Sequence, residues 1–177
     1  IRSTALILYA IYAGMTVVQF VLMICGGMPL FDAITIAIGT AGTGGFAVTN
    51  AGLGGYSYYI QTVVAVFMVL FGVNFNVYYL FLIKKPKQAL KSEEVRWYFI
   101  IIITAVILIT WNTRGMYSSL YDSAHHAFFQ VATLISSTGF ATTDFNLWPT
   151  LSKTILLLIM FCGACAGSTG GGIKVSR

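Results

Sequence analysis

Hydrophobic residues in this chain are gathered into four long runs, separated by segments rich in glycine or in charge. The runs cover residues 3–25, 57–83, 97–111 and 151–161. An α-helix needs about 20 apolar residues to cross the hydrocarbon core of a bilayer, and the longest runs reach that length. The pattern therefore predicts an all-α protein that crosses a membrane several times.

Two further segments are apolar but interrupted by glycine. One spans Pro29 to Asn50, between the first and second runs, and an equivalent segment lies between the third and fourth. Non-helical backbone at membrane depth is tolerated only where protein or a water-filled cavity surrounds it. We therefore expect two re-entrant hairpins, each with a half-helix going in, at 31–40 and 125–136, and an extended strand coming out.

The composition excludes an ordinary soluble domain. Of 177 residues, 58% are hydrophobic and 8% charged, against roughly 25% charged in soluble proteins, and the mean hydropathy is +0.85. The net charge of +5 could suggest nucleic-acid binding, but five of the ten Lys and Arg residues lie between 84 and 96. Such clustering is typical of a cytoplasmic loop of a membrane protein, so no nucleic acid is expected as a partner.

This basic loop gives the orientation. With 84–96 in the cytoplasm, Arg2 and Arg177 fall on the same side after an even number of crossings, and both hairpins enter from outside. The chain begins at Ile1 without a methionine and stops directly after a glycine cluster. We expect it to be an excerpt of a longer protein.

An internal repeat appears at an offset of 94 residues. It aligns TGGFAVTN, from Thr43, with STGFATTD, from Ser137. The chain is thus predicted to hold two units of span, re-entrant hairpin and span, at 1–83 and 97–177, joined by the basic loop. Each unit crosses the membrane an even number of times, so the repeats are parallel, which favours a pore on their common axis. Inverted repeats would instead favour a carrier with a midplane site.

The strand of each hairpin has the composition of an ion filter. Each half-helix directs its C-terminal end, which carries partial negative charge, toward the membrane centre, where cations are favoured. Small side chains and glycine let carbonyl oxygens replace a hydration shell. The alternative is that these glycines only allow close helix packing. The candidate filter residues are Thr43, Gly44 and Gly45 in one unit and Ser137, Thr138 and Gly139 in the other.

The fourth run ends in GACAGSTGGG, which has five glycines in ten residues. Each glycine costs a helix about 1 kcal/mol relative to alanine, so a helix cannot easily persist there. The repeat places this break at the depth of 72–76, on the cytoplasmic side of the strands. A helix-end turn is the simpler alternative. The segment comprises Gly163, Ala164, Cys165, Ala166, Gly167, Ser168, Thr169, Gly170, Gly171 and Gly172.

Several motifs suggest chemistry that their context does not support. Cys162 and Cys165 form a CxxC pair, but no second ligand pair accompanies them. The sequence GSTGGGIKVS resembles a phosphate loop, yet Ile173 stands where that motif requires lysine. We interpret His125 and His126 as polar residues at the mouth of the re-entrant helix.

Two asparagines and the basic loop each allow two interpretations. Asn74 and Asn76, within the second run, would either line the pore or form hydrogen bonds between helices. The loop at 84–96 either only sets the orientation or also docks a cytosolic regulator.

TAGTGGFAVTN, HHAFFQVATLISSTGFATTDFNLWP and GACAGSTGGGIKVSR resemble the bacterial TrkH/KtrB potassium-uptake proteins of the Trk/Ktr/HKT superfamily. The resemblance covers the whole chain. It implies four M1-P-M2 units, each a span, a re-entrant pore helix with its filter strand, and a span, around a pseudo-fourfold pore. The chain would hold the second and third units. It also implies that residues 163–172 form an intramembrane gate loop and that the six strand residues line the filter, with the adjacent Gly44 and Gly45 leaving its register open by one residue.

The same resemblance implies the function and the partners. The protein would take up potassium across the bacterial inner membrane, with the ion as substrate, no covalent cofactor and no enzymatic step. It would form a homodimer in the lipid bilayer, with a cytosolic nucleotide-binding subunit of the TrkA/KtrA type. Two alternatives stay open, a carrier for sodium or potassium with a midplane site and a non-conducting membrane subunit, as does the preference between the two ions.

The charge pattern predicts the topology directly. A single cysteine at Gln88 should resist an impermeant maleimide applied to intact cells, whereas one at Leu53, in the external segment 52–56, should react. Labelling of the first and protection of the second would overturn the orientation and the direction of both hairpins.

Overall fold

The structure, a computed structural model, describes residues 2–83 and 92–176. Within these residues it is helical and has no β-strand, apart from one bridge between Cys162 and Ile173. The helices are α1 (Arg2–Cys25), α2 (Leu30–Ala41), α3 (Tyr58–Phe71), α4 (Phe75–Leu82), α6 (Glu93–Thr113), α7 (Leu120–Ile135), the 3₁₀ turn η1 (Phe145–Leu147) and α8 (Thr150–Phe161). Most of the basic loop, including Gln88, lies outside the described residues.

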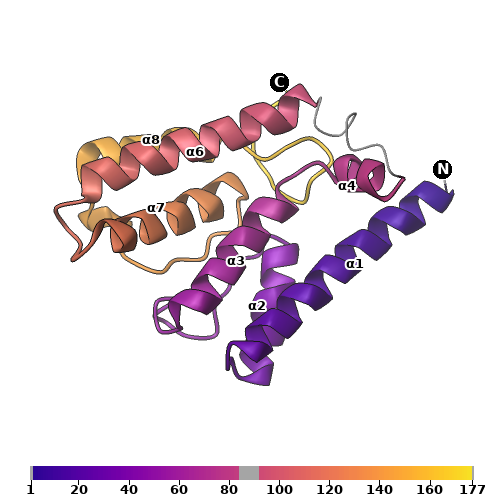
Figure 1. Cartoon of the computed structure of the whole chain (residues 1–177), viewed down its shortest axis with the longest axis horizontal. Helices are drawn as coiled ribbons and strands as arrows, with labels where there is room; N and C mark the ends of the chain where they lie inside the picture. Colours follow the sequence, from indigo (N-terminus) through magenta and orange to yellow (C-terminus); the bar gives the residue numbers. More distant parts are fainter. Residues whose placement is uncertain (1, 84–91, 177) are drawn as a thin grey trace.

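The helices fall into two halves with the same order (Figure 1). A long helix, a short helix and an irregular segment come first in each half, followed by another helix. The two short helices, α2 and α7, end at Ala41 and Ile135. These residues are 94 positions apart, so the sequence offset recurs in the order of the elements.

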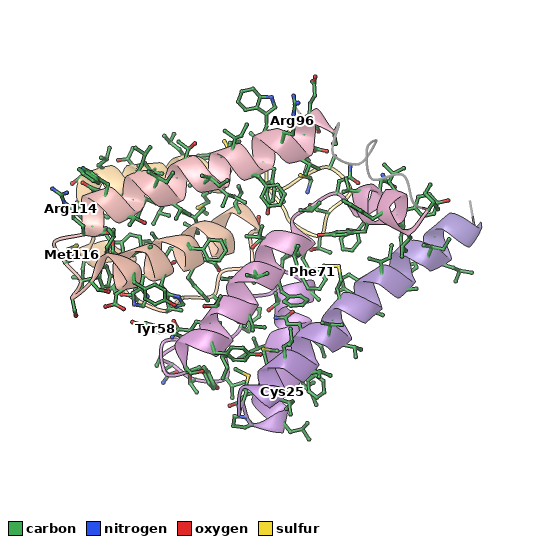
Figure 2. The ribbon with its side chains drawn as sticks, viewed as in Figure 1. Cys25, Tyr58, Phe71, Arg96, Arg114 and Met116 are labelled. Atoms are coloured by element: carbon green, nitrogen blue, oxygen red, sulfur yellow. The ribbon has the colours of Figure 1, made fainter. Side chains whose placement is uncertain are left out.

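Within the described residues two helices are long and apolar enough to cross a membrane, Ala5–Cys25 and Glu93–Thr113. The start of α1 and α4 lie at the right of Figure 1, and the turn between α6 and α7 lies at the left. Arg96 and Arg114 mark the two ends of α6 in Figure 2. The Arg114 guanidinium lies 4.2 Å from the ring centre of Trp111, a cation–π pair of residue types common at membrane interfaces.

The second hydrophobic run, 57–83, was expected to form the second span of its unit, and in the structure it is not one continuous helix. The run forms two helices, α3 and α4, which meet at 90°. Helix α3 ends at Phe71, with Gly72 as its C-cap, and the side chain of Asn74 accepts a hydrogen bond from the backbone N–H of Asn76 at 2.9 Å. That bond caps a new helix, because asparagine is among the strongest N-cap residues.

The second re-entrant helix also begins earlier than expected. It starts at Leu120 and not at His125, because the side chain of Ser119 accepts a hydrogen bond from the N–H of Asp122 and caps the helix there. The first re-entrant helix starts at Leu30, directly after Pro29, one residue before the expected position.

The two halves share one hydrophobic core, built where α3 packs on α7 (Figure 1). Val64 and Met68 of α3 and Phe129 of α7 are fully buried in it. Tyr98 of α6 is also fully buried, and its hydroxyl donates to the carbonyl of Val69 at 3.1 Å. The second half is thereby held against the C-terminal end of α3, next to the α3–α4 break.

The structure corrects the choice of Leu53 as an external reporter. Its side chain is fully buried, and its backbone N–H donates to the carbonyl of Ala141 at 2.8 Å. Gly55, two residues on, is exposed and has open space at its Cα. A cysteine at Gly55 is therefore the sound reporter for this segment.

Packing at the α3–α4 break predicts a stability effect. A methyl group on Gly72 would collide with the hydroxyl of Tyr98. Gly72→Ala should therefore lower the free energy of unfolding by about 1–3 kcal/mol, the usual cost of overpacking. Thermal denaturation of the purified protein in detergent measures the effect.

Gly55→Ala, in open space, is the matched control and should leave the melting temperature unchanged. In a Tyr98→Phe background, which removes the colliding hydroxyl, Gly72→Ala should cost less than in the wild type. An equal cost in both backgrounds would show that this contact does not limit packing.

Candidate functional site

Both candidate filter strands contain backbone in the left-handed region at matching positions. The φ angles are +52° at Thr43 and +65° at Gly45, and +60° at Ser137 and +95° at Gly139. Residues other than glycine rarely adopt such backbone angles. Successive carbonyls of an ordinary strand point to opposite sides, whereas a left-handed residue at every second position can turn them toward one side. The φ pattern aligns Gly45, and not Gly44, with Gly139.

The structure brings the two strands into contact. A methyl group on Gly45 would collide with the carbonyl oxygen of Thr138, and it would lie 3.1 Å from the carbonyl carbon of Gly139. Gly44 has only ordinary contacts, the nearest at 3.8 Å from a Phe46 ring atom. Only glycine at position 45 lets the two backbones approach this closely.

Each strand starts at the C-terminal end of a re-entrant helix. The helices α2 and α7 end in turns whose last N–H groups, on Gly42 and Ser136, bond back to helix carbonyls. Polar side chains then fix the second strand, because the N–H of Gly139 donates to the hydroxyl of Thr133 at 3.1 Å. The hydroxyls of Ser136 and Thr138 lie 2.7 Å apart. The negative ends of two helix dipoles thus flank the paired strands.

An open hollow lies beyond the strands, on the side expected to face outward. It has a volume of about 460 Å³ and is lined by residues from both halves, within 45–52 and 139–144. The side-chain amide of Gln130 donates to the carbonyl of Thr143 at 3.2 Å and holds one wall in place. The hollow therefore opens directly onto the glycine strands.

His125 is a structural residue that bridges the two halves at this end. Its Nε2 lies 2.8 Å from Oε1 of Gln61, whose amide nitrogen donates to the carbonyls of Leu53 and Tyr56. The Gln61 oxygen must then accept, so the Nε2 of His125 carries the proton. Its ring also stacks on Tyr58, with centroids 4.4 Å apart.

Two more contacts stabilise this outer end. The ring of His126 stacks on Tyr117, and its Nδ1 lies 3.2 Å from the hydroxyl of Thr142. Tyr56 donates to the carboxylate of Asp32 at 2.7 Å. Burial, with Asp32 beside it, raises the pKa of Tyr56 to about 12, so this hydroxyl keeps its proton at physiological pH. The two histidines thus serve structure at the mouth, as their positions in the sequence suggested.

The glycine-rich segment after α8 forms a closed loop beneath the strands. Its base is joined by a hydrogen bond from the N–H of Gly163 to the carbonyl of Ile173, at 2.7 Å. Near its tip, the carbonyl of Thr169 accepts a bond from the hydroxyl of Thr43 at 3.4 Å. A methyl group on Gly171 would lie 3.4 Å from the hydroxyl of Ser137. The loop therefore lies against the start of both strands.

The same loop is fastened to the break between α3 and α4. The N–H of Cys165 donates to the carbonyl of Gly72 at 3.0 Å, and the N–H of Phe75 donates to the carbonyl of Gly167 at 3.2 Å. The backbone groups that the α3–α4 break leaves without helix partners thus form their hydrogen bonds with the loop after α8. The loop therefore contacts residues within 72–76, the stretch beside which the repeat placed it.

One residue at this site was not found in the sequence. Glu94, in the first turn of α6, accepts the N–H of Ala166 at 2.5 Å and the side-chain amide of Asn74 at 3.5 Å. It lies within the stretch 84–96 that the sequence assigned to the basic loop, whereas α6 already begins at Glu93. Asn74 was expected either to line the pore or to bond between helices, and it bonds between helices.

The cysteines form no site in the part of the chain that the structure describes. Cys165 is buried and Cys162 exposed, and neither is in a disulfide. Among residues 2–83 and 92–176, no group of three or more His, Cys, Asp or Glu residues could hold a metal ion.

A helical membrane fold with paired glycine strands at the ends of re-entrant helices is typical of cation-conducting proteins. The family model of TrkH, described as a cation transport protein, matches residues 1–177. The chain belongs to the TrkH family.

Individual relatives agree with this assignment. The potassium uptake protein TrkH of Salmonella typhimurium is 35% identical over 182 residues, which cover 100% of this chain and 38% of that protein. TrkG of Escherichia coli is also 35% identical, over 100% of this chain and 37% of its own length. The chain therefore spans less than two fifths of these relatives.

A solved structure confirms the fold. The crystal structure of the potassium transporter TrkH from Vibrio parahaemolyticus matches with a TM-score of 0.93 and 34% identity. The match covers 99% of this chain and 39% of that one. The expected all-α membrane fold is thereby confirmed.

Proposed function

We propose that the protein containing this chain takes up potassium across the bacterial inner membrane through a channel-like pore. The observation that carries the proposal is the pair of left-handed strands in contact at the ends of two re-entrant helices. The relatives named above are potassium uptake proteins, which supports potassium as the transported substrate. The proposal involves no covalent chemistry.

In this proposal the strands form part of the selectivity filter. Carbonyl oxygens of Thr43–Gly45 and Ser137–Gly139 replace water around a dehydrated potassium ion, and the two helix ends make the site favourable for a cation. The alternative that these glycines serve only helix packing fits less well. They lie on strands after the helices end, with left-handed angles in both copies.

We also propose that further units of the same kind complete a pseudo-fourfold ring. Phe140 is 1% exposed, and its ring lies 3.2 Å from where a methyl group on Gly39 of α2 would stand. Phe46, at the equivalent position of the first strand, is 82% exposed. In a ring of repeated units, one surface of each unit packs against a different surface of the next. The edge that carries Phe46 would therefore stay open until a further unit covers it.

The loop 163–172 acts as the gate in this proposal. It lies against the inner start of both strands, where it would obstruct an ion leaving the filter. Its small residues leave several backbone arrangements close in energy, which suits a segment that moves between two positions.

The partners follow from the family resemblance and the charge pattern. We propose a homodimer in the lipid bilayer, with 84–96 in the cytoplasm within reach of a nucleotide-binding regulator of the TrkA/KtrA type. A carrier with a midplane site would show no single-channel currents in a planar bilayer, whereas the proposed pore would. A non-conducting subunit would tolerate glycine substitutions in both hairpins without any change in ion flux.

The filter assignment predicts which glycines control selectivity. A serine at Gly45 or Gly139 must adopt a left-handed angle, at a cost of about 1–2 kcal/mol, and at Gly45 it also meets the backbone of Thr138. Gly139→Ser and Gly45→Ser should reduce potassium-over-sodium discrimination about tenfold, since 1.4 kcal/mol corresponds to that factor. Competitive uptake into proteoliposomes measures the ratio.

Gly44→Ser is the matched control, because Gly44 is not left-handed and has only ordinary contacts. It should change discrimination less than Gly45→Ser or Gly139→Ser. Wild-type discrimination in well-expressed Gly45→Ser and Gly139→Ser variants would reduce these glycines to packing elements.

The gate assignment predicts the effect of shortening the loop. Deleting 167–171 removes the part that contacts the strands and should raise ion flux several-fold. It should also make flux less dependent on the cytosolic regulator. A correctly inserted deletion variant with wild-type flux and wild-type dependence on the regulator would leave 163–172 as a helix break only.

A further inference from the structure

We propose that Glu94 is a positioning residue that holds the glycine-rich loop beneath the strands. The proposal rests on the gate function proposed above. The carboxylate of Glu94 joins three segments that are far apart in the sequence: the start of α6, the α3–α4 break and the loop. One oxygen accepts the N–H of Ala166 at 2.5 Å and the other accepts the amide of Asn74 at 3.5 Å.

The loop offers Glu94 a donor that nothing within its own turn uses. The N–H of Ser168 donates to the carbonyl of Cys165 at 3.2 Å, which closes a β-turn over 165–168. Gly167, at the third position of this turn, has a φ of +72°, as a type II turn requires. In such a turn the N–H of the second residue, here Ala166, points away from the turn's own bond. Glu94 satisfies that half-buried N–H group with a charged acceptor.

Asn74 is oriented so that it supports the same contact. Its side-chain oxygen accepts the N–H of Asn76 at 2.9 Å and caps α4. This bond turns its amide nitrogen toward Glu94. A methyl group on Gly167 would also lie 3.2 Å from the Asn74 oxygen, so the turn of the loop lies directly on this asparagine.

A carboxylate in the first turn of a helix is favourable for the helix itself. Glu93 occupies the same turn, is exposed, and forms no side-chain hydrogen bond with any residue within 2–83 or 92–176. A purely helix-stabilising role would therefore be shared by both glutamates. The contacts to the loop belong to Glu94 alone, which makes Glu93 a matched control for charge and position.

The position of Glu94 indicates which movement would break its contact with the loop. Glu94 is the second residue of α6, whose first turn lies within the stretch 84–96 proposed to face the cytoplasm. A displacement of the start of α6 would withdraw the carboxylate from Ala166 and release the turn at 165–168. Glu94 would then transmit movement of the cytosolic segment to the gate.

The test compares Glu94→Ala with Glu93→Ala in the full-length protein reconstituted into liposomes. Two readouts are taken: potassium flux with and without the regulator, and the rate at which Cys165 reacts with a small thiol reagent. Cys165 is the first residue of the turn and is fully buried, so its reactivity reports movement of the loop. The labelling background retains Cys165 as the only cysteine.

Glu94→Ala should raise the basal flux and the Cys165 labelling rate about tenfold, as expected for loss of a charged hydrogen bond, and should reduce the dependence on the regulator. Glu93→Ala should match the wild type in every readout. Equal behaviour of the two variants, or wild-type labelling of Cys165 in Glu94→Ala, would overturn the proposal.

Ala166→Pro provides a second variant if Glu94→Ala is poorly expressed. Proline removes the N–H that Glu94 binds, yet it suits the second position of this turn. It should reproduce the effect of Glu94→Ala, and the double variant should show no further change, because both remove one contact. Additive effects would mean that Glu94 acts elsewhere.

The loop deletion, run in parallel, separates this inference from the proposed function. If deletion of 167–171 changes flux and Glu94→Ala does not, the gate stands and the role of Glu94 falls. If neither changes flux, the gate assignment itself fails.

Discussion

Irregular backbone within a membrane must find hydrogen-bond partners inside the protein, because lipid supplies none. This constraint governs the centre of the molecule. The break after α3 leaves the carbonyls of Phe71 and Gly72 without a hydrogen-bond partner in the helix. The N–H groups of Thr169 and Cys165, from the loop after α8, bond to them instead. Each irregular segment is therefore possible only because the other lies against it. A displacement of one segment must therefore displace the other and, through the bond from Thr43 to Thr169, the first strand.

The packing that supports this arrangement depends on a close approach at Gly72. Tyr98 reaches from α6 across the end of α3 and bonds to the carbonyl of Val69. Its hydroxyl occupies the space that a side chain at position 72 would need. The same tyrosine lies one helical turn from Glu94, so one face of α6 contacts both the break and the loop. The position of α6 thus sets the geometry beneath the strands.

Much of this fold could be predicted from the sequence, since hydrophobic runs and a repeat at a fixed offset are visible without a structure. The strand positions followed from the repeat, because Gly45 and Gly139 keep the same flanking Phe and Ala. The break at Gly72–Asn74 was missed, since a lone glycine and asparagine are tolerated within a membrane helix. Glu94 was missed because its partners, Ala166 and Asn74, lie 72 and 20 residues away. Only the tertiary structure brings such groups together.

The hydrogen bonds of the loop are unequal in length, and this inequality bears on how it could move. At its base the N–H of Gly163 bonds to Ile173 at 2.7 Å, within the ordinary range. At its tip the bonds from Thr43 to Thr169 and from Thr169 to Phe71 are 3.4 Å long, which is weak. The base also has a longer bond, from the N–H of Ile173 to the carbonyl of Phe161 at 3.3 Å, so the long bonds are not confined to the tip. Between base and tip, the turn is held to the α3–α4 break by bonds of 3.0 and 3.2 Å, whereas its contact with the Glu94 carboxylate is 2.5 Å long and charged. Because a charged hydrogen bond is stronger than a neutral one, Glu94 contributes more than either backbone bond to the position of the turn.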